Sequence, residues 1–149
     1  MNYTLFLKWI MPLFYFSLWL SHPQDNLSGL VNQSYLYQVF AFLMATQVSY
    51  TLYRIHYRTI AIFLWIALIS TLFFSYLNHP QIHLVLANTA FVLYTYPFLR
   101  KFQYYPSTWK IISLLLALAA LSIVSQGTIT GLSEYSYLIA LSYFYSFQV

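Results

Sequence analysis

Hydrophobic residues along the chain fall into six long blocks that are separated by short polar segments. The blocks cover residues 3–21, 34–53, 59–77, 82–99, 111–126 and 132–147. A helix needs about 20 apolar residues to cross the roughly 30 Å hydrocarbon core of a bilayer, and the blocks are close to that length. The pattern therefore predicts an all-α fold, a polytopic transmembrane helical bundle with five or six membrane-spanning helices. No segment is left over for a soluble domain, so we expect a single transmembrane helical domain of residues 1–149.

The last block leaves the number of spans open. Residues 132–147 include several Tyr and Ser and are only moderately apolar. The preceding segment, 127–131, has a glycine at each end, which suits a tight reversal between two helices. The block either crosses the bilayer, which places both termini on the same side, or lies in the interface, which leaves five spans and places the termini on opposite sides.

The first block begins like a secretory signal peptide, because Lys8 precedes an apolar stretch. A cleavage site requires small residues at A-x-A spacing. This block ends instead in Leu-Ser-His-Pro, residues 20–23. We therefore expect the segment to be kept as the first helix.

The composition agrees with a membrane location. Hydrophobic residues make up 61% of the chain and charged residues only 5%, whereas soluble domains carry about 25% charged residues. So few charges cannot cover a surface that faces water, and lipid must surround the helices instead. Aromatic residues make up 22%, and Tyr and Trp favour the boundary between lipid and water. The chain has no Cys, which excludes disulfides, thiolate metal sites and cysteine nucleophiles.

The basic residues predict the orientation of the helices. The cations in the connecting segments are Arg54, Arg58, Arg100, Lys101 and Lys110. Because cytoplasmic loops are rich in Lys and Arg, we expect these loops in the cytoplasm and the protein in a bacterial inner (plasma) membrane. The connections that hold Asp25 and His79 then face outward. The net charge of +4 reflects this topology, and no nucleic-acid partner is expected.

Several potential metal ligands map to the outer end of the predicted helices. They are His22, His79, His83 and Glu134. His79 and His83 are four residues apart, so a helix would place both imidazoles on one face. No cofactor is predicted from the sequence, although histidines with a carboxylate would suit zinc or iron. The alternative is that polar residues simply gather where helices meet water, since the spacing lacks the compact H-E-x-x-H pattern of metalloproteases.

Three amide side chains lie inside the predicted spans, at Gln38, Gln47 and Asn88. An amide in hydrocarbon needs a hydrogen-bonding partner, so we expect Gln47 and Asn88 to point at other helices. They would then either hold helices together or line a path for an ion or small solute. No charged residue lies at the centre of a span, which disfavours a proton-coupled pump.

These observations lead to three hypotheses of function. The first is a non-enzymatic membrane component, working as a homo-oligomer or as a subunit in assembly, sensing or passive permeation. The second is a small ion or solute channel lined by Gln47 and Asn88. The third is a metal-dependent membrane enzyme with an extracytoplasmic His and carboxylate site. We favour the first, because ionisable groups are scarce and no catalytic residue is identified. Its expected partners are the lipid bilayer and a second copy or another membrane subunit, which small residues in the second and fifth blocks would help to bind.

Overall fold

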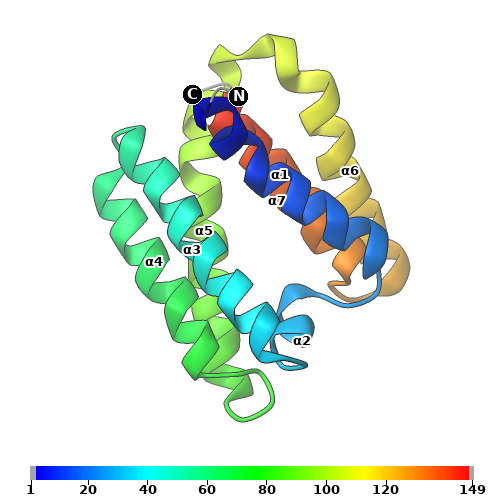
Figure 1. Cartoon of the computed structure of the whole chain (residues 1–149). Coiled ribbons are helices and arrows are strands. Elements are labelled where there is room, and N and C mark those ends of the chain that lie inside the picture. Colours follow the sequence, from blue (N-terminus) through cyan, green and yellow to red (C-terminus); the bar gives the residue numbers. More distant parts are fainter. Residues whose placement is uncertain (1–2, 148–149) are drawn as a thin grey trace. The chain divides into compact units, whose positions relative to one another are not determined.

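The computed structural model describes residues 3–147, which form seven α helices and two short 3-10 helices, with none of these residues in a strand (Figure 1). The elements are α1 (Tyr3–Ser21), α2 (Leu27–Val31), α3 (Tyr35–Arg54), α4 (Arg58–Phe73), α5 (Pro80–Lys101), η1 (Phe102–Tyr104), η2 (Pro106–Thr108), α6 (Trp109–Gln126) and α7 (Gly131–Phe147). The predicted all-α fold class is confirmed. Each of the six hydrophobic blocks forms a long helix, and α2 is a short helix that the pattern did not predict.

The helix ends differ from the predicted ones by a few residues. The largest difference is in α4, which ends at Phe73 although its hydrophobic block continues to residue 77. By length and composition, two helical segments are suited to cross a membrane, Pro80–Tyr104 and Trp109–Gln126. Helix α4 is apolar but shorter. A bundle with five or six spans therefore stays a prediction.

Contacts within the chain group its residues into two compact units. Unit 1 comprises residues 1–27 and 102–149, and unit 2 comprises residues 28–101. The predicted single domain of residues 1–149 stays a prediction.

Helix α7 is the central helix of unit 1, since it contacts both α1 and α6 (Figure 1). Its start is held by Ser133, whose hydroxyl oxygen accepts the Thr130 N–H at 3.0 Å. Nine of its residues are buried: Gly131, Ser133, Tyr135, Ser136, Ala140, Leu141, Ser142, Phe144 and Tyr145. The segment whose location was left open by the sequence is thus a packed helix of a bundle.

In unit 2, α4 occupies the corresponding place, since it contacts both α3 and α5. Its buried residues are Ala61, Leu64 and Ala67, which recur every three residues and so lie on one face. Two of the three are alanines, and small residues let neighbouring helix backbones approach closely. The indole N–H of Trp65 donates to the Thr46 hydroxyl oxygen at 3.1 Å and links α4 to α3.

Candidate functional site

The segment between α1 and α2 packs on the start of α7 in unit 1. The Leu132 N–H donates to the Pro23 carbonyl oxygen at 2.7 Å, and the Tyr135 hydroxyl donates to the Asp25 carbonyl oxygen at 2.7 Å. We call this contact between residues 22–27 and 131–135 the clamp. It joins segments that are more than a hundred residues apart in the chain.

Glu134, one of the predicted metal ligands, is a hydrogen-bonding partner within the clamp. Its carboxylate accepts the Leu27 N–H at 2.7 Å. Leu27 is the first residue of α2, so this amide has no partner inside its own helix. Glu134 also lies in the first turn of α7. A negative charge is favourable near a helix N-terminus, and here it lies near two of them.

Gly131 allows the two sides of the clamp to approach closely. A Cβ atom at this position would collide with the backbone oxygens of His22 and Asp25 and with the Tyr135 ring. Only glycine, which has no side chain, fits there. One turn further along α7, the buried Ser136 hydroxyl oxygen accepts the indole N–H of Trp19 at 3.1 Å. These polar contacts therefore link α1 and the segment that follows it to α7 within unit 1.

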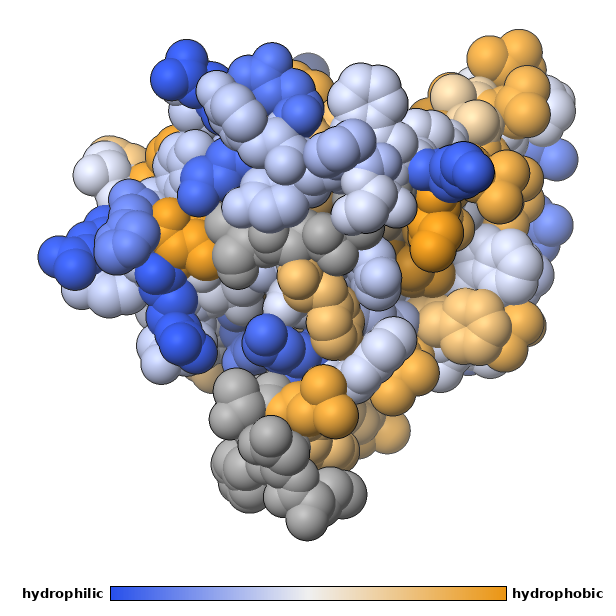
Figure 2. Space-filling view, turned by 90° about the horizontal axis from the view of Figure 1, so that it is seen from above, coloured by the Kyte–Doolittle hydropathy of each residue, from blue (hydrophilic) through white to orange (hydrophobic). Residues whose placement is uncertain are grey.

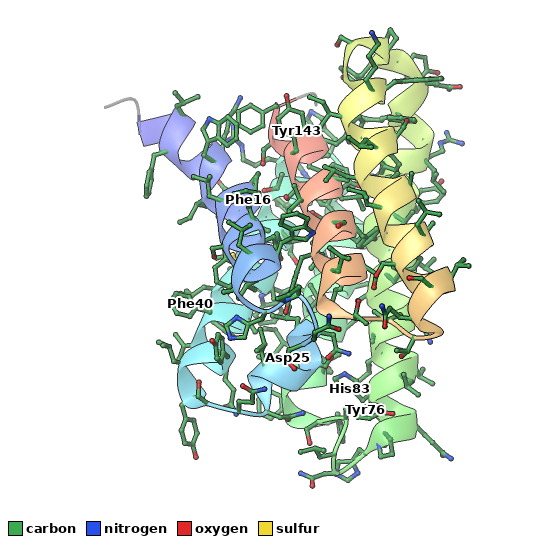
Figure 3. All side chains as sticks on the ribbon, turned by 90° about the vertical axis from the view of Figure 1, so that its right-hand side faces the viewer. Phe16, Asp25, Phe40, Tyr76, His83 and Tyr143 are labelled. Carbon is green, nitrogen blue, oxygen red and sulfur yellow. The ribbon has the colours of Figure 1, made fainter. Side chains whose placement is uncertain are left out.

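The two other predicted metal ligands lie in unit 2, at the start of α5. His83 is buried, with Nδ1 2.8 Å from the Phe74 carbonyl oxygen and Nε2 2.9 Å from the Ser28 hydroxyl oxygen. Because a carbonyl only accepts, Nδ1 carries a proton, and Nε2 shares a hydrogen bond with the Ser28 hydroxyl. The Tyr76 ring packs on His83 at 6.0 Å (Figure 3). Both ring nitrogens of His83 are thus engaged by the protein itself.

His79 precedes Pro80, the first residue of α5, and is exposed. Its ring packs against Phe74 at 5.5 Å, and its carbonyl oxygen accepts the His83 N–H at 2.9 Å. Pro80 is the first residue of α5, where its missing N–H costs nothing because the amides of the first turn have no partner within the helix.

The four predicted metal ligands divide between the units, with His22 and Glu134 in unit 1 and His79 and His83 in unit 2. His22 Nδ1 lies 2.8 Å from the hydroxyl of Ser21. Within the part of the chain that the structure describes, no group of three His, Asp or Glu side chains is arranged to hold a metal ion. A zinc or iron site therefore stays a prediction.

The amides of the predicted spans have different surroundings within unit 2. The Gln38 amide donates to the Val31 carbonyl oxygen at 3.4 Å, while the Gln47 side chain is partly buried. Asn88 is exposed on α5 within this chain, so the expected contact with another helix stays a prediction. The side-chain bond between α3 and α4 comes instead from Thr46 and Trp65. The sequence gave no sign that the indole of Trp65 would reach Thr46.

Four of the five loop cations share one end of unit 2. The Arg58 guanidinium lies 5.3 Å from the centre of the Tyr53 ring, and the Lys101 ammonium lies 5.6 Å from the centre of the Tyr57 ring. Arg54 ends α3 and Arg100 lies in the last turn of α5, so both belong to the same end. The fifth cation, Lys110, belongs to unit 1 and is the second residue of α6.

Comparison with known proteins gives no relative: no family model matches the chain, and no curated protein or solved structure is significantly similar to it.

Proposed function

We propose that the chain is a small integral membrane protein that acts as a non-enzymatic component, as a homo-oligomer or as a subunit of a membrane complex. The observation that carries this proposal is the exposure of its most apolar helices. In the most apolar windows of Pro80–Tyr104 and Trp109–Gln126, only 28% and 17% of the residues are buried. A core helix of a soluble protein has the same composition but is mostly buried. Helices that are this apolar and this exposed are suited to a lipid environment.

Large apolar side chains are exposed on the other long helices as well. On α1 they include Leu13 and Leu20, and on α4 they include Ile62 and Phe63. In water each would cost about 25 cal/mol for every Å² of exposed apolar surface, whereas lipid does not penalise it. The space-filling view likewise shows hydrophobic residues at the surface beside hydrophilic ones (Figure 2). These faces support a polytopic arrangement that includes α1 and α4.

The charges support one orientation for that arrangement. The basic end of unit 2 and the loop before Lys110 would face the cytoplasm of a bacterial inner membrane, because cations are retained on that side. The connection that holds His79 lies at the opposite end of unit 2 and would face outward. In unit 1, Asp25 would face outward in the same way.

Two exposed features support association with a second copy or another subunit. Asn88 is exposed on α5, and an amide surrounded by lipid is stabilised when another chain supplies its hydrogen bonds. On α6, Ala119 and Ser122 are buried, whereas Ala117 and Ala120 are exposed. The exposed alanines would allow another helix to approach closely. A channel lined by Asn88 and Gln47 between such copies is the second candidate, since it would also use the exposed amide.

Membrane insertion can be tested with the full chain expressed in bacteria. We expect it to stay in the membrane pellet after carbonate extraction. Single cysteines that replace His56 and Gln103 should be labelled from the same side, and a cysteine at Asn78 from the other. Release by carbonate, or labelling of positions 56 and 103 from opposite sides, would contradict the proposed topology.

Association can be tested separately by light scattering of the detergent-solubilised protein, corrected for bound detergent. We expect a mass above the 17.6 kDa of one chain, or a partner retained in mild detergent. Asn88→Leu should weaken that association, while Asn78→Leu, outside the helices, should leave it unchanged. If Asn88 lines a channel, the same change should instead alter ion flux into liposomes. A lone chain without flux would contradict both candidates.

A further inference from the structure

The basic end of unit 2, defined as Arg54, Arg58, Arg100 and Lys101 with Tyr53 and Tyr57, is a surface that the proposed function leaves without a partner. The three arginines are exposed, and Lys101 is partly buried. The contacts of Arg58 with the Tyr53 ring and of Lys101 with the Tyr57 ring bring the ends of α3, α4 and α5 together. Four of the six Lys and Arg residues of the chain thus lie at the same end of unit 2.

No acid within unit 2 balances these charges. Residues 28–101 contain neither Asp nor Glu. The two acids of the chain, Asp25 and Glu134, belong to unit 1, and the Glu134 carboxylate already accepts the Leu27 N–H. The partner that complements the basic end is therefore an anion from outside unit 2.

The backbone holds the cations of the α3–α4 connection in place. Ile55 N–H donates to the Thr51 carbonyl oxygen at 3.2 Å, and Tyr57 N–H donates to that of Leu52 at 3.1 Å. His56 lies between them in the left-handed region, with φ 74°. A residue in this conformation ends a helix sharply, and the N–H groups around it donate to the last carbonyl oxygens of the helix. The backbone at Arg54 and Arg58 is thus fixed before any ligand arrives, which lowers the entropic cost of binding.

From this charge and geometry, and resting on the membrane location proposed above, we propose that the basic end binds the phosphate groups of anionic lipids in the adjoining leaflet. The planar guanidinium groups of arginine bind phosphate oxygens in pairs, which a compact ammonium does not do. Tyrosine rings occupy the headgroup level of a bilayer, where their apolar faces meet lipid and their hydroxyls meet water. Each cation near an anionic membrane surface adds roughly fivefold to the affinity.

The test is a titration of the detergent-solubilised full chain with phosphatidylglycerol or phosphatidylcholine, with bound lipid counted by native mass spectrometry. We expect tighter binding of phosphatidylglycerol. The double variant R58Q/K101Q should weaken that binding by roughly 25-fold and leave phosphatidylcholine unchanged. The matched control is K8Q/K110Q, which removes the same charge from unit 1 and should keep the preference. Arg58→Lys keeps the charge but loses the planar fork, and we expect an intermediate affinity. Circular dichroism of each variant checks that the helices remain.

Three outcomes would overturn the proposal. Equal binding of the two lipids would show that the basic end does not select anions. An equal loss of phosphatidylglycerol binding in K8Q/K110Q would show that the preference depends on the total charge of the chain and not on the basic end. Displacement of phosphatidylglycerol by millimolar inorganic phosphate would indicate a site for free phosphate. Carbonate extraction keeps these results separate from the proposed function: a chain that stays in the membrane but shows no preference contradicts only this inference.

Discussion

Each of the two units has only a few charged residues, and the two units use them in opposite ways. Unit 1 holds two cations, Lys8 and Lys110, and both acids, so its formal charge is zero. Unit 2 holds four cations and no acid, so it carries the whole net charge of +4. In unit 1 the carboxylate of Glu134 bonds to the backbone inside the clamp, while the arginines of unit 2 are exposed. In unit 1 a charged residue holds segments of the chain together, whereas in unit 2 the charges are available to the anionic partner that we propose.

The central helices differ in the same sense. Helix α7 buries serines whose hydroxyls are bonded, such as Ser133 and Ser136. Helix α4 buries only small or aliphatic side chains, and its long hydrophobic residues point outward. In the neighbouring α3, the buried Ser49 hydroxyl lacks a hydrogen-bonding partner. We therefore expect unit 1 to be more sensitive to substitution than unit 2.

The largest expected effect is that of Gly131→Ala in the clamp. Its methyl group would meet two backbone oxygens, which cannot move without shifting the segment 22–25. We expect a loss toward the upper end of the roughly 1–3 kcal/mol range for overpacking, measured as the free energy of unfolding in detergent. Gly127→Asn is the control, because Gly127 has open space around it and asparagine tolerates its positive φ. Equal losses in the two variants would show that the clamp is not rigid.

Glu134→Ala should have the next largest effect. It removes the acceptor of the Leu27 N–H and should cost about 1–2 kcal/mol, since that amide then lacks its partner. Glu134→Gln retains a carbonyl oxygen and should cost less. The control is Asp25→Asn at the other, exposed acid, where we expect a change below about 0.5 kcal/mol. If Glu134→Ala left the free energy of unfolding unchanged, the hydrogen bond to the Leu27 N–H would not stabilise the protein.

Two tryptophans allow a direct comparison of the units. Trp19→Phe leaves the buried Ser136 hydroxyl without its indole donor and should cost about 1–2 kcal/mol. Trp65→Phe breaks the bond to Thr46, whose hydroxyl keeps the Phe42 carbonyl oxygen as its acceptor. Hydrogen bonds between membrane helices average about 0.6 kcal/mol, and we expect a loss of that size. Unfolding in detergent measures both variants. A larger loss for Trp65→Phe would reverse the proposed order of the two units.

The smallest effect concerns Ser49, and its sign is opposite. Because the buried hydroxyl makes no hydrogen bond in the structure, Ser49→Ala should stabilise the protein by roughly 0.5 kcal/mol. The comparison is Ser133→Ala in unit 1, which removes a bonded hydroxyl and should destabilise it. The same unfolding measurement applies. Destabilisation by both changes would indicate that Ser49 has a partner in the membrane.

The sequence by itself determined the long helices of this protein and the ends at which its charges gather. Helix formation depends on residues a few positions apart. The hydrophobic blocks therefore predicted both ends of α1 correctly and the ends of α6 and α7 to within two residues. The loop cations likewise follow from where each block ends. The short α2 was missed because five residues carry too little periodicity to be recognised.

The tertiary structure alone decided which polar residues act together. The sequence offered Glu134 as a candidate metal ligand, and the structure shows its carboxylate bonded to the Leu27 N–H more than a hundred residues away, a contact that no local pattern encodes. His83 is bonded through both ring nitrogens, and Asn88 is exposed on α5. The surroundings of each side chain depend on which segment packs against its helix. That is set by the packing of α7 between α1 and α6 and of α4 between α3 and α5. Hydrophobic periodicity tells which face of a helix is apolar, but the same face can meet lipid, another helix or a second chain.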